Sequence, residues 1–133
     1  MKVNIEVELS VQDMMDLLCT AFEGGVNYWV TSILGEGGDT GKLPEGRTKI
    51  EHEYEWLAVG GSLKIGYEDE ERLYRYLDQD KLQKGLQEWI FRNSVQVYYD
   101  GARRDTALDL GNIDAGDADE IVQFALFGKL VFG

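Results

Sequence analysis

Few residues in this chain could carry nucleophilic or metal chemistry. It contains one cysteine, Cys19, and one histidine, His52. A nucleophilic site would need this thiol beside the imidazole, and the sequence leaves that pairing open. We favour a buried, inert thiol, because Cys19 lies next to Leu18 near the apolar face of a predicted helix. One cysteine and one histidine cannot assemble a Cys/His zinc cluster within a single chain.

Carboxylates offer a second kind of chemistry. Glu23 stands beside Gly24 and Gly25, where a ligand or another backbone could approach closely. The alternative is that the two glycines permit tight helix packing and that Glu23 pairs with an arginine. The acids of residues 109–120 do not follow the spacing of a calcium-binding loop, and helix capping explains them better. We assign no catalytic residue and expect no metal and no cofactor, but a small hydrolase that pairs Glu23 with one of these acids stays an alternative.

Two adjacent arginines could bind an anion. Arg103 and Arg104 fall in an expected loop, where they could hold a phosphate group or simply remain solvated. Aromatic side chains could stack on a base, although most aromatic residues at such spacings belong to the core. The candidate ligand-binding residues are Glu23, Asn27, Tyr28, Arg103 and Arg104.

A long helix, predicted from Val11 to Leu34, would position three of these candidates. Its apolar residues recur at steps of three and four, and Ser10 with Asp13 forms a capping box at its start. Gly24 and Gly25 cost a helix about 1 kcal/mol each, so they need a compensating role.

The second half of that helix is unusually poor in charge. From Ala21 to Leu34, Glu23 is the only charged residue. A helix of this kind is normally covered on more than one side. We therefore expect Trp29 to be structural, like the two glycines, and the protein to self-associate as a homo-oligomer, by default a symmetric dimer.

The remaining chain alternates short strands with two further helices. Strands are expected at 2–9, 48–59, 63–67, 72–77, 95–99 and 130–132, and helices at 79–92 and 115–127, the last ended by Gly128. This order predicts an α+β fold over residues 1–133. It is a single domain with a mostly antiparallel sheet of short strands, packed against the long N-terminal helix and two further helices.

Charge and hydropathy restrict the partners. The 133 residues carry 25 acidic and 13 basic side chains, a net charge of −12. Such a surface repels DNA and RNA, so we expect no direct nucleic-acid binding, although an acidic nucleic-acid mimic stays an alternative. The N-terminus does not read as a signal peptide, and no apolar run approaches the roughly 20 residues of a membrane span. We expect a cytoplasmic protein without membrane contact.

Two motifs carry a resemblance to known proteins. EGGVNYW at residues 23–29 and DADEIVQFALFGKLVFG at residues 117–133 resemble a group of small phage and prophage proteins with no established activity. The resemblance implies a phage accessory protein in the host cytoplasm. By analogy with other small phage proteins, we expect a non-enzymatic binding protein or anti-defence factor. Its partner would be a host defence protein or a nucleotide-like small molecule.

Overall fold

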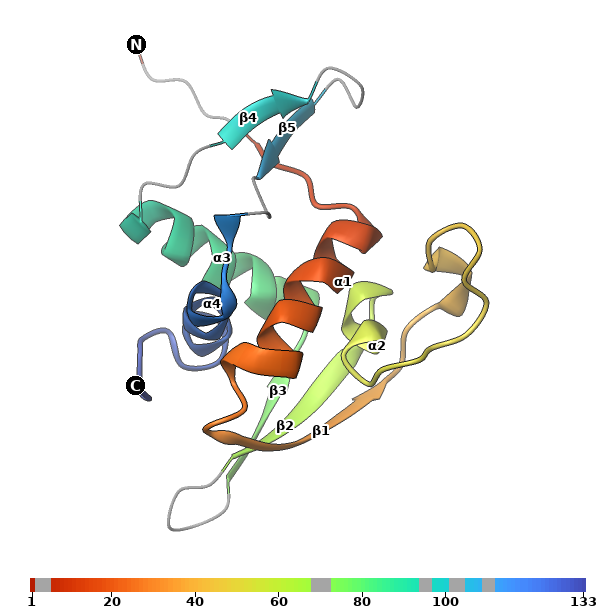
Figure 1. The fold of residues 1–133 in the computed structure, drawn as a ribbon, viewed down its shortest axis with the longest axis horizontal. Helices are drawn as coiled ribbons and strands as arrows, with labels where there is room; N and C mark the ends of the chain where they lie inside the picture. The colour runs from red at the N-terminus through yellow and green to blue at the C-terminus, as the bar shows by residue number, and fades with distance from the viewer. Residues whose placement is uncertain (2–5, 68–72, 94–96, 101–104, 109–111) are drawn as a thin grey trace.

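The computed structural model describes residues 1, 6–67, 73–93, 97–100, 105–108 and 112–133. In chain order, its elements are helix α1 (Val11–Thr20), π-helix η1 (Ala21–Gly25), strand β1 (Val30–Glu36), 3₁₀-helix η2 (Thr40–Lys42), helix α2 (Glu55–Ala58), strands β2 (Ser62–Tyr67) and β3 (Leu73–Leu77), helix α3 (Gln79–Asn93), strands β4 (Val97–Asp100) and β5 (Asp105–Leu108), and helix α4 (Ala115–Phe127). The predicted α+β fold is confirmed. Helices α1, α3 and α4 lie together on one side of the sheet β1-β2-β3 (Figure 1).

The predicted 11–34 helix is only partly correct. Helix α1 does begin at the capping box, with Ser10 Oγ and the Asp13 carboxylate each accepting a main-chain N–H of the other residue at 3.0 Å. The helix then loosens into η1, in which Val26 N–H bonds to Ala21 C=O at 3.0 Å, five residues back. After this turn the chain becomes strand β1, because β-branched residues such as Val30 favour an extended backbone.

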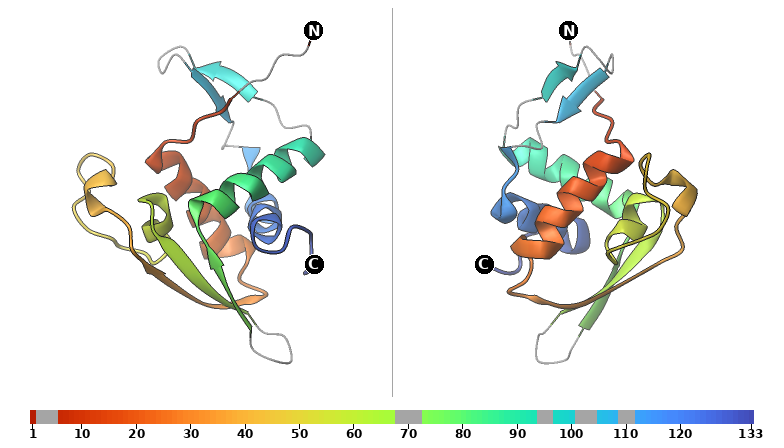
Figure 2. Two further views of the ribbon diagram at one scale, coloured as in Figure 1. Left: turned by 180° about the vertical axis from the view of Figure 1, so that it is seen from behind. Right: turned by 45° about the vertical axis from the view of Figure 1, so that its right-hand side comes forward.

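The sheet is antiparallel throughout. Strand β2 is central and pairs with β1 on one side and β3 on the other, in rows such as Leu34–Lys64–Tyr76 and Ser32–Gly66–Tyr74. The strands predicted at 63–67 and 72–77 are thereby confirmed as neighbours. Strands β4 and β5 form a separate antiparallel pair beyond the helices, on the side away from the main sheet (Figure 2). The strand expected at 95–99 corresponds to β4, whereas β5 was not predicted.

The prediction of a strand at 48–59 is wrong. These residues belong to a long connection that ends in α2, whose first residue is Glu55. The Glu55 carboxylate is buried and accepts hydrogen bonds from Arg47 Nη2 at 2.8 Å and from the main-chain N–H of Glu51 at 2.7 Å. This carboxylate holds the connection in a turn, which overrides the β propensity of its aromatic residues.

Helices α3 and α4 match their predicted ranges closely. Asp78 precedes α3 and accepts the Lys81 N–H at 2.9 Å. Asp114 begins α4 with a capping box, and Gly128 ends it with a φ of 71°. That left-handed conformation favours glycine and explains why the helix stops there. The two helices pack closely, because a Cβ at Gly85 would lie 2.5 Å from the main-chain nitrogen of Ala125.

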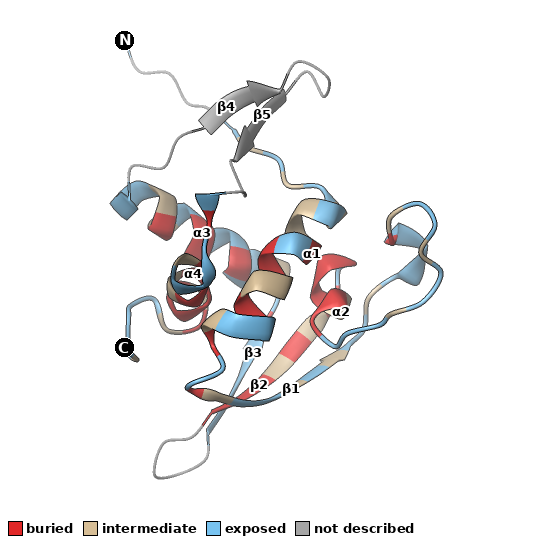
Figure 3. Ribbon diagram, in the orientation of Figure 1, coloured by how far each residue is buried: buried red, intermediate tan, exposed pale blue. Residues whose placement is uncertain are grey.

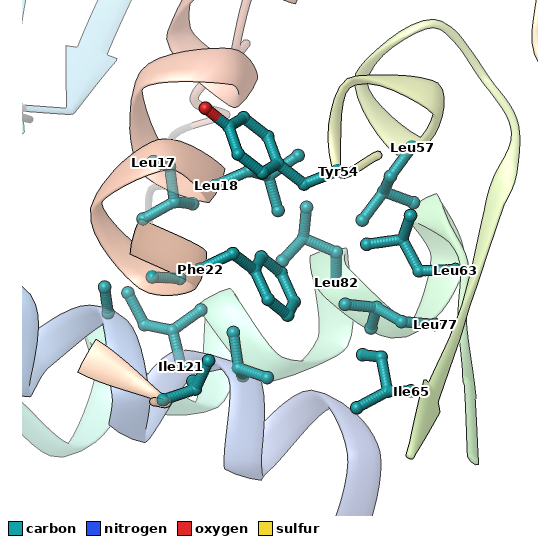
Figure 4. Close-up of a cluster of buried hydrophobic side chains, with 14 of the residues drawn as sticks. Leu17, Leu18, Phe22, Tyr54, Leu57, Leu63, Ile65, Leu77, Leu82 and Ile121 are labelled. Atoms are coloured by element: carbon teal, nitrogen blue, oxygen red, sulfur yellow. The ribbon is translucent and has the colours of Figure 1, made fainter. Parts of the chain in front are cut away.

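Apolar side chains from both layers meet in a single core. Figure 4 shows leucines of α1, α2, β2, β3 and α3 pointing toward Phe22 of η1 and the ring of Tyr54. Phe22 and Tyr54 stack with ring centroids 6.3 Å apart. The side chains with zero exposed surface are Leu18, Leu57, Leu63, Ile65, Leu77, Ala118 and Ile121. The core therefore ties α1 and α4 to the sheet.

Both predicted terminal strands are wrong where the structure describes them. Residues 6–9 have no regular secondary structure, and 2–5 lie outside the described residues. Residues 130–132 also form no strand. Instead the Gln123 side chain accepts the main-chain N–H groups of Val131 at 2.7 Å and Phe132 at 2.8 Å. A helix side chain thus supplies the pairing that a neighbouring strand would have provided.

Candidate functional site

The two sequence motifs meet at the buried carboxylate of Asp119. This residue of α4 is 7% exposed and accepts Trp29 Nε1–H at 2.7 Å on one oxygen. Its other oxygen accepts the hydroxyl of Tyr28 at 2.5 Å. The partners are separated by 90 and 91 positions in the chain. Residues that look unrelated in the sequence therefore form one polar centre.

Gln123 extends this centre to the C-terminal segment. Its side-chain nitrogen lies 3.0 Å from Asp119 Oδ1, 3.3 Å from the Tyr28 hydroxyl and 3.2 Å from the Phe132 carbonyl oxygen. Asp119 and Gln123 are four residues apart, so α4 presents both on one face. Because Gln123 bonds both to the centre and to Phe132, the segment after α4 is fixed against the start of β1.

Close backbone packing makes this arrangement possible. A Cβ at Gly25 would overlap the carbonyl oxygen of Ala115 and approach the Asp119 nitrogen to 3.2 Å, so η1 touches the first turn of α4 directly. Trp29 then stacks on Phe132 with ring centroids 4.9 Å apart and is only 4% exposed. Gly25 and Trp29 thus lie at the contact between η1, α4 and the C-terminal segment. Gly24 differs, because a Cβ there would meet only the Ala115 Cβ at 3.7 Å.

A surface pocket of about 580 Å³ opens beside this centre. Residues 27–31 line one side, and Phe132 and Gly133 line the other. Two predicted ligand-binding residues, Asn27 and Tyr28, therefore face the same cavity. Tyr28 is 59% exposed, although its hydroxyl is tied to Asp119. Burial of that hydroxyl and its bond to Asp119 raise the pKa of Tyr28 to about 12, so the phenol stays protonated at neutral pH.

Glu23 does not line this pocket. Its Oε2 accepts hydrogen bonds from Cys19 Sγ at 2.6 Å and from the Tyr54 hydroxyl at 2.8 Å. The expected arginine partner is therefore replaced by a thiol and a phenol. The bonds from Cys19 and Tyr54 lower the pKa of Glu23. The bond to Glu23 in turn raises the pKa of the Cys19 thiol, which disfavours the nucleophilic thiolate at neutral pH.

The single histidine lies near this thiol cluster without completing a metal site. The His52 ring stacks on Tyr54 with centroids 5.2 Å apart and planes within 3°. Within the described ranges, no group of three or more His, Cys, Asp or Glu side chains is placed to hold a metal ion. In the cluster of Cys19, Glu23 and Tyr54, the pKa of the carboxyl is lowered while the pKa values of the thiol and the phenol are raised, so the protons stay on Cys19 and Tyr54.

The anion-binding prediction falls outside the described part of the chain. Arg103 and Arg104 both belong to residues 101–104, whose placement is not described. Two described arginines lie over aromatic rings, Arg92 with its guanidinium carbon 5.1 Å from the Phe124 centroid and Arg75 with its guanidinium carbon 5.0 Å from the Phe127 centroid. Arg75 Nε also lies 3.2 Å from the Tyr67 hydroxyl. The sequence did contain a signal for this residue. Arg75 is the middle residue of a predicted strand, and alternation puts it on the same face as Leu77.

The face of the sheet away from the helices is unusually rich in exposed apolar surface. We define this outer face by Ser32, Leu34, Lys64, Tyr74 and Tyr76, which stand in two neighbouring cross-strand rows. The largest of them are exposed, with Leu34 at 57%, Tyr74 at 58% and Tyr76 at 52% (Figure 3). The two tyrosines and the leucine come from opposite edge strands, with Lys64 and Gly66 of the central strand between them.

The central strand has no side chain at one position of this outer face. Gly66 stands between Ser32 and Tyr74, and a Cβ there would overlap Ser32 Oγ and lie 3.2 Å from the Tyr74 ring. Lys64 Nζ lies 4.4 Å from the centroid of the same ring. Lys64 thus makes a cation–π contact with Tyr74, and Gly66 leaves room for the Tyr74 ring because it has no side chain.

Comparisons with protein-family models, curated proteins and solved structures found no match to this chain. Among the described residues, no helix is both long enough and apolar enough to cross a membrane. The outer face and the pocket beside Tyr28 are the two features whose geometry bears on function.

Proposed function

We propose that this chain is a non-enzymatic binding protein that docks on a partner protein through the outer face of its sheet. The observation that carries the proposal is the group of exposed side chains Leu34, Tyr74 and Tyr76 on one face of the sheet. Exposed apolar patches of this kind mark interaction sites in soluble proteins, and tyrosine is among the residues that contribute most to binding energy.

The rigidity of the face favours binding. A side chain that is already immobilised loses little conformational entropy on association. Tyr74 is held by Lys64 and packed across Gly66, and Tyr76 belongs to the same hydrogen-bonded strand. The face is thus ordered before any partner arrives, and its apolar area can be buried at low entropic cost.

The net charge specifies the kind of partner. A charge of −12 attracts basic surfaces and repels acidic ones over roughly a Debye length, about 8 Å at physiological ionic strength. We therefore propose a protein with a basic rim around an apolar centre. In the phage setting that the two motifs imply, this partner is a cytoplasmic host protein, and the chain is an accessory or anti-defence factor.

The test is the double variant Leu34→Ala/Tyr76→Ala in a purified binary complex. Candidate partners are first isolated from bacterial cells that express the protein, then purified and titrated by calorimetry. Two central residues of an interface are worth about 2 kcal/mol or more each, so the variant should bind at least about 100-fold more weakly. The affinity of the wild-type protein should also fall as salt is raised.

The matched control is Phe91→Ala. Phe91 is 83% exposed on α3 and does not belong to the outer face. This control should leave the affinity unchanged. Equal loss of binding in both variants, or none in the double variant, would contradict the proposal. Sedimentation of the protein alone tests the expected homo-oligomer, since a dimer that dissociates only in the double variant would show that the outer face binds a second copy.

A further inference from the structure

The pocket beside Tyr28 combines an exposed aromatic ring with polar, uncharged neighbours. Asn27 and Thr31 are both exposed and contribute an amide and a hydroxyl to its lining. Phe132 also belongs to the lining and provides apolar surface. Among the residues that the structure describes, no lysine, arginine or histidine lines the pocket. A ligand with a negatively charged group would therefore find no cation there, in contrast to the nucleotide-like ligand expected from the sequence.

The surroundings favour a positive charge instead. Asp119 lies behind the Tyr28 ring and accepts bonds from three donors, which are the Tyr28 hydroxyl, Trp29 Nε1 and Gln123 Nε2. A carboxylate that only accepts hydrogen bonds carries the pattern of its ionised form. Among the described residues, no lysine or arginine lies within 4.0 Å of it. Its charge is thus offset by the dipoles of these donors, and the Tyr28 hydroxyl connects it to the pocket, whose lining does not include Asp119 itself.

The geometry of Tyr28 suits a flat cation. Its hydroxyl is fixed at 2.5 Å from Asp119, which prevents the exposed ring from turning freely. A guanidinium group stacks on aromatic faces and donates several hydrogen bonds in one plane. The Asn27 carbonyl oxygen and the Thr31 hydroxyl are acceptors of the kind that such a group needs.

We propose that this pocket accepts an arginine side chain of the partner protein. The inference deepens the proposed function and rests on it for the source of the arginine, because a protein with a net charge of −12 selects basic partners. The pocket adjoins β1, which begins at Val30 and carries Leu34 of the outer face. The two features therefore share strand β1, the pocket at its start and the outer face from Ser32 onward.

The experiment uses the isolated protein and a small probe, so it does not depend on the partner. N-acetyl-arginine amide is titrated while the NMR signals of Asn27, Tyr28 and Thr31 are followed, with N-acetyl-citrulline amide as the neutral isostere and AMP as an anionic, aromatic ligand. We expect the arginine probe to bind at least fivefold more tightly than citrulline or AMP. Tyr28→Ala should weaken it at least fivefold, and Asn27→Asp should strengthen it by adding a negative charge.

The matched control is Phe91→Ala. Phe91 is an aromatic residue that is 83% exposed on α3, outside both the pocket and the outer face. Its loss should leave the arginine probe unaffected. Tighter binding of AMP, equal binding of citrulline, or weaker binding to Asn27→Asp would overturn the arginine pocket. If the arginine probe does not bind while the partner still docks through Leu34 and Tyr76, this inference alone is refuted. If the probe binds but docking does not depend on Leu34 and Tyr76, the proposed function alone is refuted.

Discussion

A methyl group added at Gly25 should destabilise the protein, whereas the same change at Gly24 should not. In Gly25→Ala the new Cβ overlaps the Ala115 carbonyl oxygen and lies 3.1 Å from its carbonyl carbon. These are main-chain atoms of α4, so no rotamer change can relieve the contact. In Gly24→Ala the nearest atom is the Ala115 Cβ at 3.7 Å, which is ordinary van der Waals contact.

The free-energy cost of the clash can be compared with the gain from replacing glycine by alanine. Overpacking in a close contact costs about 1–3 kcal/mol. Replacing glycine by alanine returns about 0.5–1 kcal/mol through helix propensity and a less flexible unfolded chain. Gly25→Ala should therefore lose about 1–2 kcal/mol, or about 3–10 °C in Tm for a domain of this size. Gly24→Ala should keep or slightly raise the Tm.

Thermal unfolding followed by circular dichroism at 222 nm measures both variants under the same conditions. Urea unfolding provides the free energy independently of the heat capacity. If Gly25→Ala were as stable as Gly24→Ala, the close approach of η1 to α4 would be wrong. A loss of stability in both variants would show instead that the π-helical turn itself requires glycine.

Three further predictions concern other contacts. Gly85→Ala should lose about 1–3 kcal/mol in urea unfolding, because its Cβ would lie 2.5 Å from a main-chain nitrogen of α4. For Glu55, burial would raise the pKa, but the bond from Arg47 and two main-chain N–H groups lower it below the ordinary value of 4.5. The charge of Glu55 therefore stabilises the fold above pH 4.5, and that contribution is lost as the pH falls through the lower pKa of the folded state. Glu55→Gln should lower the free energy of unfolding at pH 7 by about 2 kcal/mol, and its stability should depend less on pH in acid. Glu23→Gln should remove the carboxylate that raises the pKa of Cys19, so alkylation of this thiol by iodoacetamide at pH 8 should become several-fold faster, and an unchanged rate would contradict the effect of the Cys19–Glu23 hydrogen bond on the thiol.

The parts of the fold that sequence reasoning predicted well are those whose signals are local. Helix α4 has a capping residue, Asp114, at one end and a glycine, Gly128, at the other, and its predicted range was correct. Asp78 marked α3 in the same way. Such signals act over three or four residues, so they can be read without knowing what the helix packs against.

The errors occur where distant residues decide the local structure. Residues 26–29 place Val26 and Trp29 in the core at a spacing that a helix would also give, so the turn was hidden within a helical pattern. Strand β1 exists because β2 lies beside it. Helix α2 depends on the contacts of Glu55 with the chain before it. None of these long-range partners can be identified from periodicity alone.

Sequence reasoning likewise found only some of the residues at the site. Asn27 and Tyr28, predicted as ligand-binding residues because they are polar and aromatic residues within an uncharged stretch, both line the pocket. Asp119 and Gln123 were missed, although both occur inside the motif at 117–133. Their signal was a polar pair at a spacing of four residues on a helix that is otherwise apolar. Acids near a helix start are usually caps, and this expectation concealed the buried one.

The π-helical turn η1 has a consequence for changes in chain length. A π turn holds one residue more than the α-helical turn that it replaces. The extra residue rotates the side chains that follow by about 100° around the helix axis. Here that rotation decides which side of the chain Tyr28 and Trp29 occupy when they reach Asp119. Deleting one residue between Ala21 and Gly25 would restore regular helical bonding locally while turning both aromatic side chains away from their acceptor. This short segment should therefore tolerate substitutions at Gly24 yet resist insertions and deletions, even though it lies partly at the surface.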